Sequence, residues 1–159
     1  MATNPINETN DEARKLGREL LSAANFAALA VVHPKTQAPH VTRIALVTME
    51  TGQPITLIST LSTHTQALLK NPNCSLLVGE PQDKGDPLTH PRLTLACQAK
   101  FIDRSSERHS ELRSFFLAKV PKSKLYIDFA DFTFVSFDIL CADLNGGFGK
   151  AFKLQSNDF

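Results

Sequence analysis

The residues best suited to chemistry lie where an expected strand runs into an expected helix. The strand Ile55–Ser59 is followed by side chains that carry hydroxyl groups and one imidazole: Ser59, Thr60, Ser62, Thr63, His64 and Thr65. The first N–H groups of a helix lack intrahelical partners, and the helix dipole favours negative charge there. The turn therefore predicts an anion site, suited to a single phosphate because no glycine-rich phosphate loop is present in the sequence. The alternative is an ordinary helix start that Ser62 or Thr63 caps.

Arg43 is the nearest candidate partner for such an anion. It lies within the expected strand His40–Thr48, where alternation places it on one face with Val41, Ala45 and Val47. An unpaired guanidinium among apolar side chains is costly, so we expect Arg43 to contact a carboxylate or a phosphate. A structural ion pair and an exposed edge-strand arginine are the alternatives. The next strand ends at the run of hydroxyl side chains from Ser59 to Thr65, which we call the hydroxyl turn. Arg43 is therefore expected to point toward that turn.

His64 lies at the start of the expected helix Ser62–Lys70. An imidazolium there is disfavoured by the helix dipole unless an anion is bound, so His64 is either a phosphate donor or a surface histidine. The other histidines show no metal-ligand spacing, and no metal site is predicted. No arrangement for nucleophilic catalysis is recognisable, so catalytic residues stay unknown, and we interpret Asp128 and Asp131 as turn residues.

The segment Gly146–Ala151 (GGFGKA) is rich in glycine. It precedes a strand rather than a helix, which excludes a dinucleotide-binding fingerprint. Closely spaced glycines at this place predict a close approach of the backbone to a flat ligand or to another subunit, or else a plain hairpin turn.

Strands with a few inserted helices carry these candidates. Alternation and turn residues predict strands at 26–33, 40–48, 55–59, 74–79, 92–103, 132–140 and 148–154, and helices at 62–70 and 106–119. A further helix is expected in the first 24 residues. The pattern indicates an α+β protein, mainly β, with antiparallel hairpins closed into a barrel or a sandwich. Residues 1–8 are expected to be disordered and residues 9–159 to form one domain.

Composition narrows the function classes. A net charge of +1 over 159 residues shows no broad basic field for nucleic acid. No stretch is long and apolar enough for a membrane span, and we expect no signal peptide. Three widely spaced cysteines in strand-like segments indicate buried thiols in a reducing compartment, hence a cytoplasmic location.

Several segments together resemble the pyridoxamine-phosphate-oxidase-like FMN-binding split-barrel superfamily, and within it the branch that includes haem-utilisation proteins. The most specific are Gly85–Leu95 (GDPLTHPRLTL) and Gly146–Ala151 (GGFGKA). The other matching segments are Ala13–Ala30, His40–Leu46, Ser62–Pro72, Ser75–Glu80 and Lys124–Phe132.

The resemblance implies a six-stranded antiparallel split β-barrel with flanking helices, which works as a homodimer with two flavin sites at the interface. It implies that an arginine of the second strand and the strand-to-helix turn hold the FMN phosphate, and we expect the glycine segment to contact the cofactor as well. The corresponding positions here are Arg43, Ile44, Ser59, Thr60, Ser62, His64, Thr65, Gly147, Phe148 and Lys150.

The chain departs from the family pattern at two places. Where the oxidases carry Ser-Arg-Lys, it has Ser62-Thr63-His64, which predicts weaker phosphate binding. Its last histidine is His109, whereas the haem-binding relatives rely on a histidine near the C-terminus. The leading hypothesis is an FMN-binding oxidoreductase with a small-molecule substrate or electron acceptor. The alternatives are a haem-handling protein that uses the same interface cleft, and a protein of this fold that binds neither.

Overall fold

The computed structural model describes residues 5–159, which form a mainly β structure with three α-helices. Its strands are β1 (Ile6–Asn7), β2 (Phe26–Val32), β3 (Pro39–Ala45), β4 (Val47–Thr48), β5 (Pro54–Ser59), β6 (Asn73–Val78), β7 (Arg92–Phe101), β8 (Phe132–Asn145) and β9 (Ala151–Gln155). Its helices are α1 (Asp11–Ala23), α2 (Thr63–Lys70) and α3 (Glu107–Lys119), with 3₁₀ turns η1 (Pro87–Thr89), η2 (Pro121–Leu125) and η3 (Ser156–Asp158). The predicted α+β class is confirmed.

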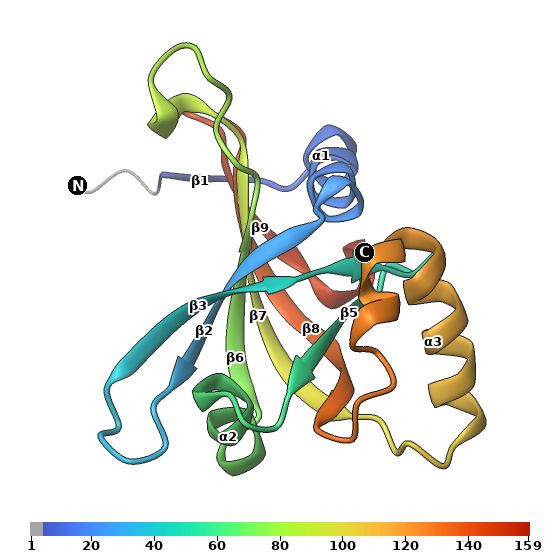
Figure 1. Ribbon diagram of the computed structural model, residues 1–159. Coiled ribbons are helices and arrows are strands. Elements are labelled where there is room, and N and C mark those ends of the chain that lie inside the picture. Colours follow the sequence, from blue (N-terminus) through green and yellow to red (C-terminus); the bar gives the residue numbers. More distant parts are fainter. Residues whose placement is uncertain (1–4) are drawn as a thin grey trace.

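One antiparallel ladder joins β9, β8, β7, β6, β2 and β3 in that order. β5 pairs with the first part of β8, and β4, which directly follows β3, pairs with β5 (Figure 1). Within residues 5–159 the sheet therefore has nine strands, not the six that were expected. The alternating pattern itself indicated β9, as the strand 148–154, but not β1 and β4, which have two residues each.

The N-terminal segment was expected to be disordered over residues 1–8. Residues 1–4 lie outside the described part of the chain. Ile6 and Asn7 form β1, which pairs in parallel with the first residues of β9. Between residues 5 and 159 no helix is both long and apolar enough to cross a membrane.

Alternate residues of the strands build the main core. On β7 the alternating residues Leu93, Leu95, Cys97 and Ala99 share one face, and all four are buried. Burying such side chains contributes about 25 cal/mol for each Å² of apolar surface removed from water, so this face fixes the register of the strand.

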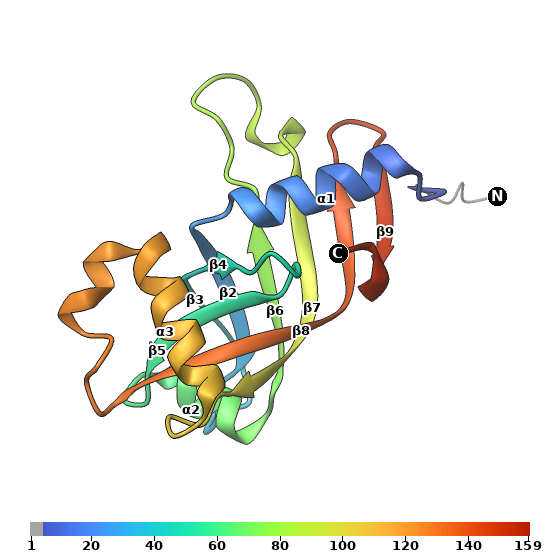
Figure 2. The ribbon, with the colours of Figure 1, turned by 90° about the vertical axis from the view of Figure 1, so that its right-hand side faces the viewer.

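Both α1 and α3 lie in front of strands in Figure 2, but they cover different faces, since residues of α1 join the main core whereas α3 packs on the other face of β5 and β8. α1 packs closely against β9, because a β-carbon at Gly17 would stand 2.5 Å from the side chain of Leu154. α3 buries Leu112 and Phe116 in a second core with Phe134 of β8. This second core makes both faces of β5 apolar, which explains its continuous run of buried residues.

α3 covers the outer side of β5 and of the first part of β8. The outer side of the remaining ladder, from β3 through β2, β6 and β7 to the last part of β8, has no helix packed on it in the described structure, and we call it the open face. The pairing of neighbouring strands arranges the side chains of this face in rows that run across the strands. One row contains Arg43, Ala28, Leu77, Thr94 and Asp143. The next row contains Val41, Ala30, Ser75, Ala96 and Cys141. Phe26 adds an aromatic ring beside the first row. Together these eleven residues define the open face, which combines small side chains with apolar ones that are well exposed, such as Val41 at 63% and Leu77 at 43%.

Candidate functional site

The hydroxyl turn forms as predicted between β5 and α2, but most of its donors have internal partners. The Ser59 hydroxyl donates to Oδ2 of Asp131 at 2.5 Å and accepts the N–H of Leu61 at 3.1 Å. The N–H of Thr60 donates to the backbone carbonyl of Asp131 at 2.7 Å. Thr65 is fully buried, and its hydroxyl donates to the carbonyl of Ser59 at 2.7 Å. These bonds fix the turn and reduce what it can offer to a ligand.

The N-terminus of α2 keeps some donors available. Ser62 is the N-cap residue by position, yet its side chain makes no capping hydrogen bond; its backbone carbonyl accepts the N–H groups of Thr65 and Gln66. In the described part of the chain, no internal acceptor pairs with the N–H groups of Thr63 and His64. The sequence allowed either an anion site or a helix start capped by a hydroxyl group, and the structure shows no side-chain cap at Ser62.

His64 is half-buried on the first turn of α2. Burial lowers its pKa below the usual 6.5, and the neighbouring His40 lowers the pKa further. His40 in turn packs edge-on against His33, with ring centroids 5.9 Å apart. A histidine with a lowered pKa is neutral near pH 7, so His64 does not supply the positive charge of the lysine that it replaces.

Arg43 occupies the open face on the last strand of the ladder and is exposed, which matches the alternative of an exposed edge-strand arginine rather than a guanidinium among buried apolar side chains. Val41, on the same face, is largely exposed, because the outer side of β3 has no covering element in the described structure. The guanidinium lies over the ring of Phe26, 5.1 Å from its centroid. None of the hydrogen bonds or ion pairs found in residues 5–159 joins Arg43 to another side chain, so its donors point to an open surface.

The strand of Arg43 nevertheless runs beside the hydroxyl turn. β3 lies next to β5, and the Thr56 hydroxyl donates to the carbonyl of Ala45 at 2.6 Å. The pairing of β4 with β5 sets Val47 opposite Ile55. Arg43 itself is not paired with β5 in the described structure, since the pairs on this side of β5 begin at Val47. Ile44, by contrast, points into the core and is buried, so its backbone is all that it can present to a ligand.

The glycine segment forms the hairpin between β8 and β9. Gly147 has a φ of 116°, a conformation that favours glycine, and its N–H donates to the side chain of Asn145 at 3.0 Å. Phe148 is 97% exposed, and Lys150 is exposed as well. This loop lies near the top of the molecule in Figures 1 and 2, against the carbonyl of Thr89.

Within one chain the predicted site residues fall into two groups. Arg43 lies on β3 and the hydroxyl turn follows β5, whereas Gly147, Phe148 and Lys150 follow the last residue of β8. β2, β6 and β7 separate Arg43 from β8, and the 14-residue length of β8 separates the hydroxyl turn, beside its first residue, from the glycine segment. One chain therefore does not bring all of the predicted residues to one ligand.

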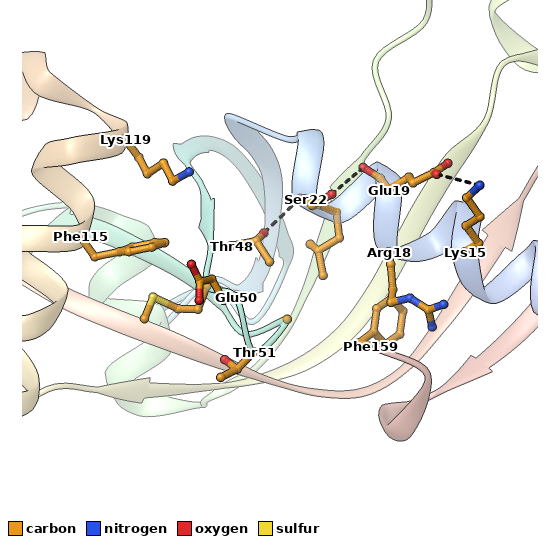
Figure 3. Close-up of a pocket in the computed structure, with 13 residues that line it drawn as sticks. Lys15, Arg18, Glu19, Ser22, Thr48, Glu50, Thr51, Phe115, Lys119 and Phe159 are labelled. Atoms are coloured by element: carbon orange, nitrogen blue, oxygen red, sulfur yellow. Dashed lines mark hydrogen bonds and ion pairs between the residues drawn. The ribbon is translucent and has the colours of Figure 1, made fainter.

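A cavity of about 540 Å³ lies elsewhere, between α1, the β4–β5 turn and α3. In Figure 3, Phe115 and Lys119 enter it from α3, and Arg18 and Phe159 lie on the opposite side, with Glu50 between them. None of the residues that line this cavity belongs to the open face, so the cavity is separate from Arg43. Sequence patterns did not indicate it, since it arises only from the packing of the two helices on the sheet.

The two buried cysteine thiols are not reactive nucleophiles. Burial raises the pKa of the Cys74 thiol to about 12 and also raises that of Cys97, so both thiols are protonated and poorly nucleophilic. Within the described range no group of three or more histidine, cysteine or acidic side chains is arranged to hold a metal ion.

Comparison with known proteins identifies a matching family and a related protein for this chain. Residues 14–140 match the family model described as pyridoxamine 5'-phosphate oxidase. A curated relative from Arabidopsis thaliana, "Non-canonical heme oxygenase HOZ, chloroplastic", is 38% identical over 109 residues, which cover 68% of this chain and 32% of that protein. This chain thus spans about a third of the length of that relative.

Two solved structures share the fold. A heme binding protein from Mycobacterium smegmatis superposes with a TM-score of 0.83 at 23% identity, over 94% of this chain and 60% of that one. ChuZ from Campylobacter jejuni gives a TM-score of 0.83 at 21% identity, over 96% and 63% of the two chains.

Proposed function

We propose, since this chain belongs to the pyridoxamine 5'-phosphate oxidase family, that it is a haem-binding member of that family and that it binds haem between two copies of itself. The observation that carries the proposal is the open face. Its small side chains, Ala28, Ala30 and Ala96 among them, offer a level surface for a planar ring. Val41 and Leu77 supply apolar contacts at its exposed places.

Arg43 gives this surface its polarity. Haem is a planar apolar ring that carries two carboxylates, and a guanidinium pairs with a carboxylate through two parallel hydrogen bonds. The stack on Phe26 holds the guanidinium at the surface while its N–H groups stay available. The name of the Arabidopsis relative, a heme oxygenase at 38% identity, supports the same ligand class.

FMN, the cofactor of the leading hypothesis from sequence, fits the residues less well. Its phosphate needs donors and positive charge at the hydroxyl turn. The hydroxyls of Ser59 and Thr65 already donate within the chain, and His64 is neutral near pH 7. Arg43 is the one fixed cation among the predicted site residues on this side of the ladder. We therefore place haem ahead of flavin.

A second copy of the chain completes the proposed site. In one chain, three strands separate Arg43 from the glycine segment and the length of β8 separates the hydroxyl turn from it, so a ligand that contacts both groups needs one group from each copy. A second open face would also cover Val41 and Leu77, which a lone chain leaves exposed to water. C2 symmetry would make two equal clefts.

The roles of the residues are binding and orientation. Bound haem would supply an iron centre; the chain would hold the ring on the open face, pair a carboxylate with Arg43 and exclude water with Val41, Leu77 and the partner copy. None of the residues that define the open face is a histidine, so the proposed contacts are to the ring and to its carboxylates.

An absorption spectrum after titration with haem and, separately, with FMN tests the proposal. We expect a saturable Soret band with haem and no retained flavin after gel filtration. Retained, fluorescent flavin without a Soret band would show that the flavoprotein hypothesis is correct and this one wrong.

A further inference from the structure

Asp131 is placed beside the hydroxyl turn by the pairing of β5 with β8. The last pair of that ladder joins Ser59 to Phe132, so the residue just before β8 comes to lie against the turn. Arg104 fixes the same segment from outside, because its guanidinium donates to the carbonyls of Phe129 at 2.7 Å and Phe132 at 2.9 Å. The position of Asp131 is thus set by backbone pairing on one side and by Arg104 on the other.

The contacts of Asp131 are those that a bound anion would make. Its carboxylate accepts the hydroxyl of Ser59 at 2.5 Å, and its backbone carbonyl accepts the N–H of Thr60 at 2.7 Å. Both donors belong to the turn that the sequence predicted to bind a phosphate. The hydroxyl is the side chain that would face an incoming anion at the end of β5.

The charge of Asp131 has no direct counter-ion. In residues 5–159 no lysine, arginine or histidine lies within ion-pair distance of its carboxylate, and Arg104 reaches only the neighbouring carbonyls. Asp128, three residues earlier, differs in this respect because it forms a two-pronged ion pair with Arg113. Within residues 5–159, the hydroxyl turn therefore already has beside it a negative group without an ion-pair partner.

We propose that Asp131 occupies the anion site of the hydroxyl turn from within the chain and thereby excludes phosphate-bearing cofactors. It takes the Ser59 hydroxyl that a phosphate would use, and its charge repels a second anion at short range. The inference deepens the proposed function, because it names the residue that selects against FMN in a fold whose cleft accepts planar cofactors.

Two flavins that differ only in the phosphate provide the test. FMN and riboflavin are titrated into the native dimer and into Asp131→Asn and Asp131→Ser, with equilibrium dialysis and flavin fluorescence as the readout. Asn keeps the acceptor for Ser59 but removes the charge, and Ser removes both, so at least one variant is expected to fold. We expect either change to raise FMN affinity about tenfold or more and to leave riboflavin affinity unchanged.

Asp128→Asn is the matched control, since it removes a nearby carboxylate that lies outside the turn. Its FMN affinity is expected to equal that of the native protein. The inference is overturned if native protein binds FMN as tightly as the Asp131 variants. It is equally overturned if those variants gain affinity for riboflavin as much as for FMN. A haem titration of the same samples separates the two proposals: failure to bind haem refutes the proposed function, whatever the flavins do.

Discussion

Arg43 and Phe26 form a cation–π pair on the open face, with the guanidinium carbon 5.1 Å from the centroid of the ring. The two residues lie on neighbouring strands, and Phe26 is itself partly exposed. Stacking restricts the arginine while leaving its N–H groups free at the edges. A guanidinium held in this way loses little conformational entropy when it binds a carboxylate.

Replacing Arg43 tests the role of this pair in ligand binding. We expect Arg43→Ala to weaken haem binding about tenfold, which corresponds to the loss of a charge-assisted hydrogen bond of about 1.5 kcal/mol. Arg92→Ala is the control, because Arg92 already donates to the carbonyl of Leu88 at 2.9 Å. Haem titrations followed at the Soret band measure both. Equal affinities for the native protein and Arg43→Ala would contradict the assignment.

Leu77 tests the expected homodimer. Its side chain is 43% exposed at the centre of the open face, and a second copy would bury it. Light scattering of the native protein should give about 35 kDa, twice the 17.5 kDa of one chain, whereas Leu77→Asp should give the monomer mass because a carboxylate is costly in an apolar interface. Leu125→Asp, on η2 and away from the open face, should remain dimeric. A native protein of monomer mass would refute the dimer.

The pKa of His64 predicts a pH dependence of stability. Because burial lowers the pKa in the folded state below 6.5, the unfolded chain binds a proton first as the pH falls below that value. The stability is therefore full above 6.5 and declines below it. Melting temperatures at about pH 5 and about pH 8 should differ less in His64→Gln than in the native protein. Some dependence will remain, since burial also lowers the pKa of His109. An unchanged difference would show that His64 is well solvated.

Asp158 contributes to stability by joining η3 to α1. Its carboxylate accepts the N–H of Gln155 at 2.7 Å and the guanidinium of Arg14 at 2.8 Å, and the first of these bonds is the main cause of its lowered pKa. Asp158→Ala should reduce the free energy of unfolding by about 1–3 kcal/mol, measured in urea. Because the pKa is lowered, the contribution is present above 3.8 and is lost as the pH falls through the folded pKa. Asp11→Ala, which removes an exposed partner of the same Arg14, should cost less; an equal cost would refute the role of the Gln155 bond.

The elements of the fold were predictable where local patterns are strong. The alternation of Leu93, Leu95, Cys97 and Ala99 identified β7 and its buried face, and the turn residues separated most strands. The face of Arg43 was not predictable, because alternation shows which residues share a face but not whether anything covers it. β1 was missed because its two residues pair with a distant strand, and β4 was merged with β3 in the predicted strand 40–48.

The site was predictable in its residues but not in its contacts. The hydroxyls between Ser59 and Thr65 indicate an anion-binding turn, and such a turn is present at the end of β5. Its partner, Asp131, is 72 residues away from Ser59 and looks in sequence like a turn residue. Only the antiparallel pairing of β5 with β8 brings the two together. The signal that could have identified Asp131 as the partner of Ser59 is the pairing of β5 with the start of β8.

Native mass spectrometry of the protein mixed with haem tests the central claim most directly, because it reports ligand and assembly together. We predict dimers of about 35 kDa, twice the mass of one chain, that carry haem, with no haem on any residual monomer. Leu77→Asp, as a monomer, should then carry none. Haem bound equally to monomers and dimers, or dimers that bind no haem, would contradict a haem site completed by the second copy.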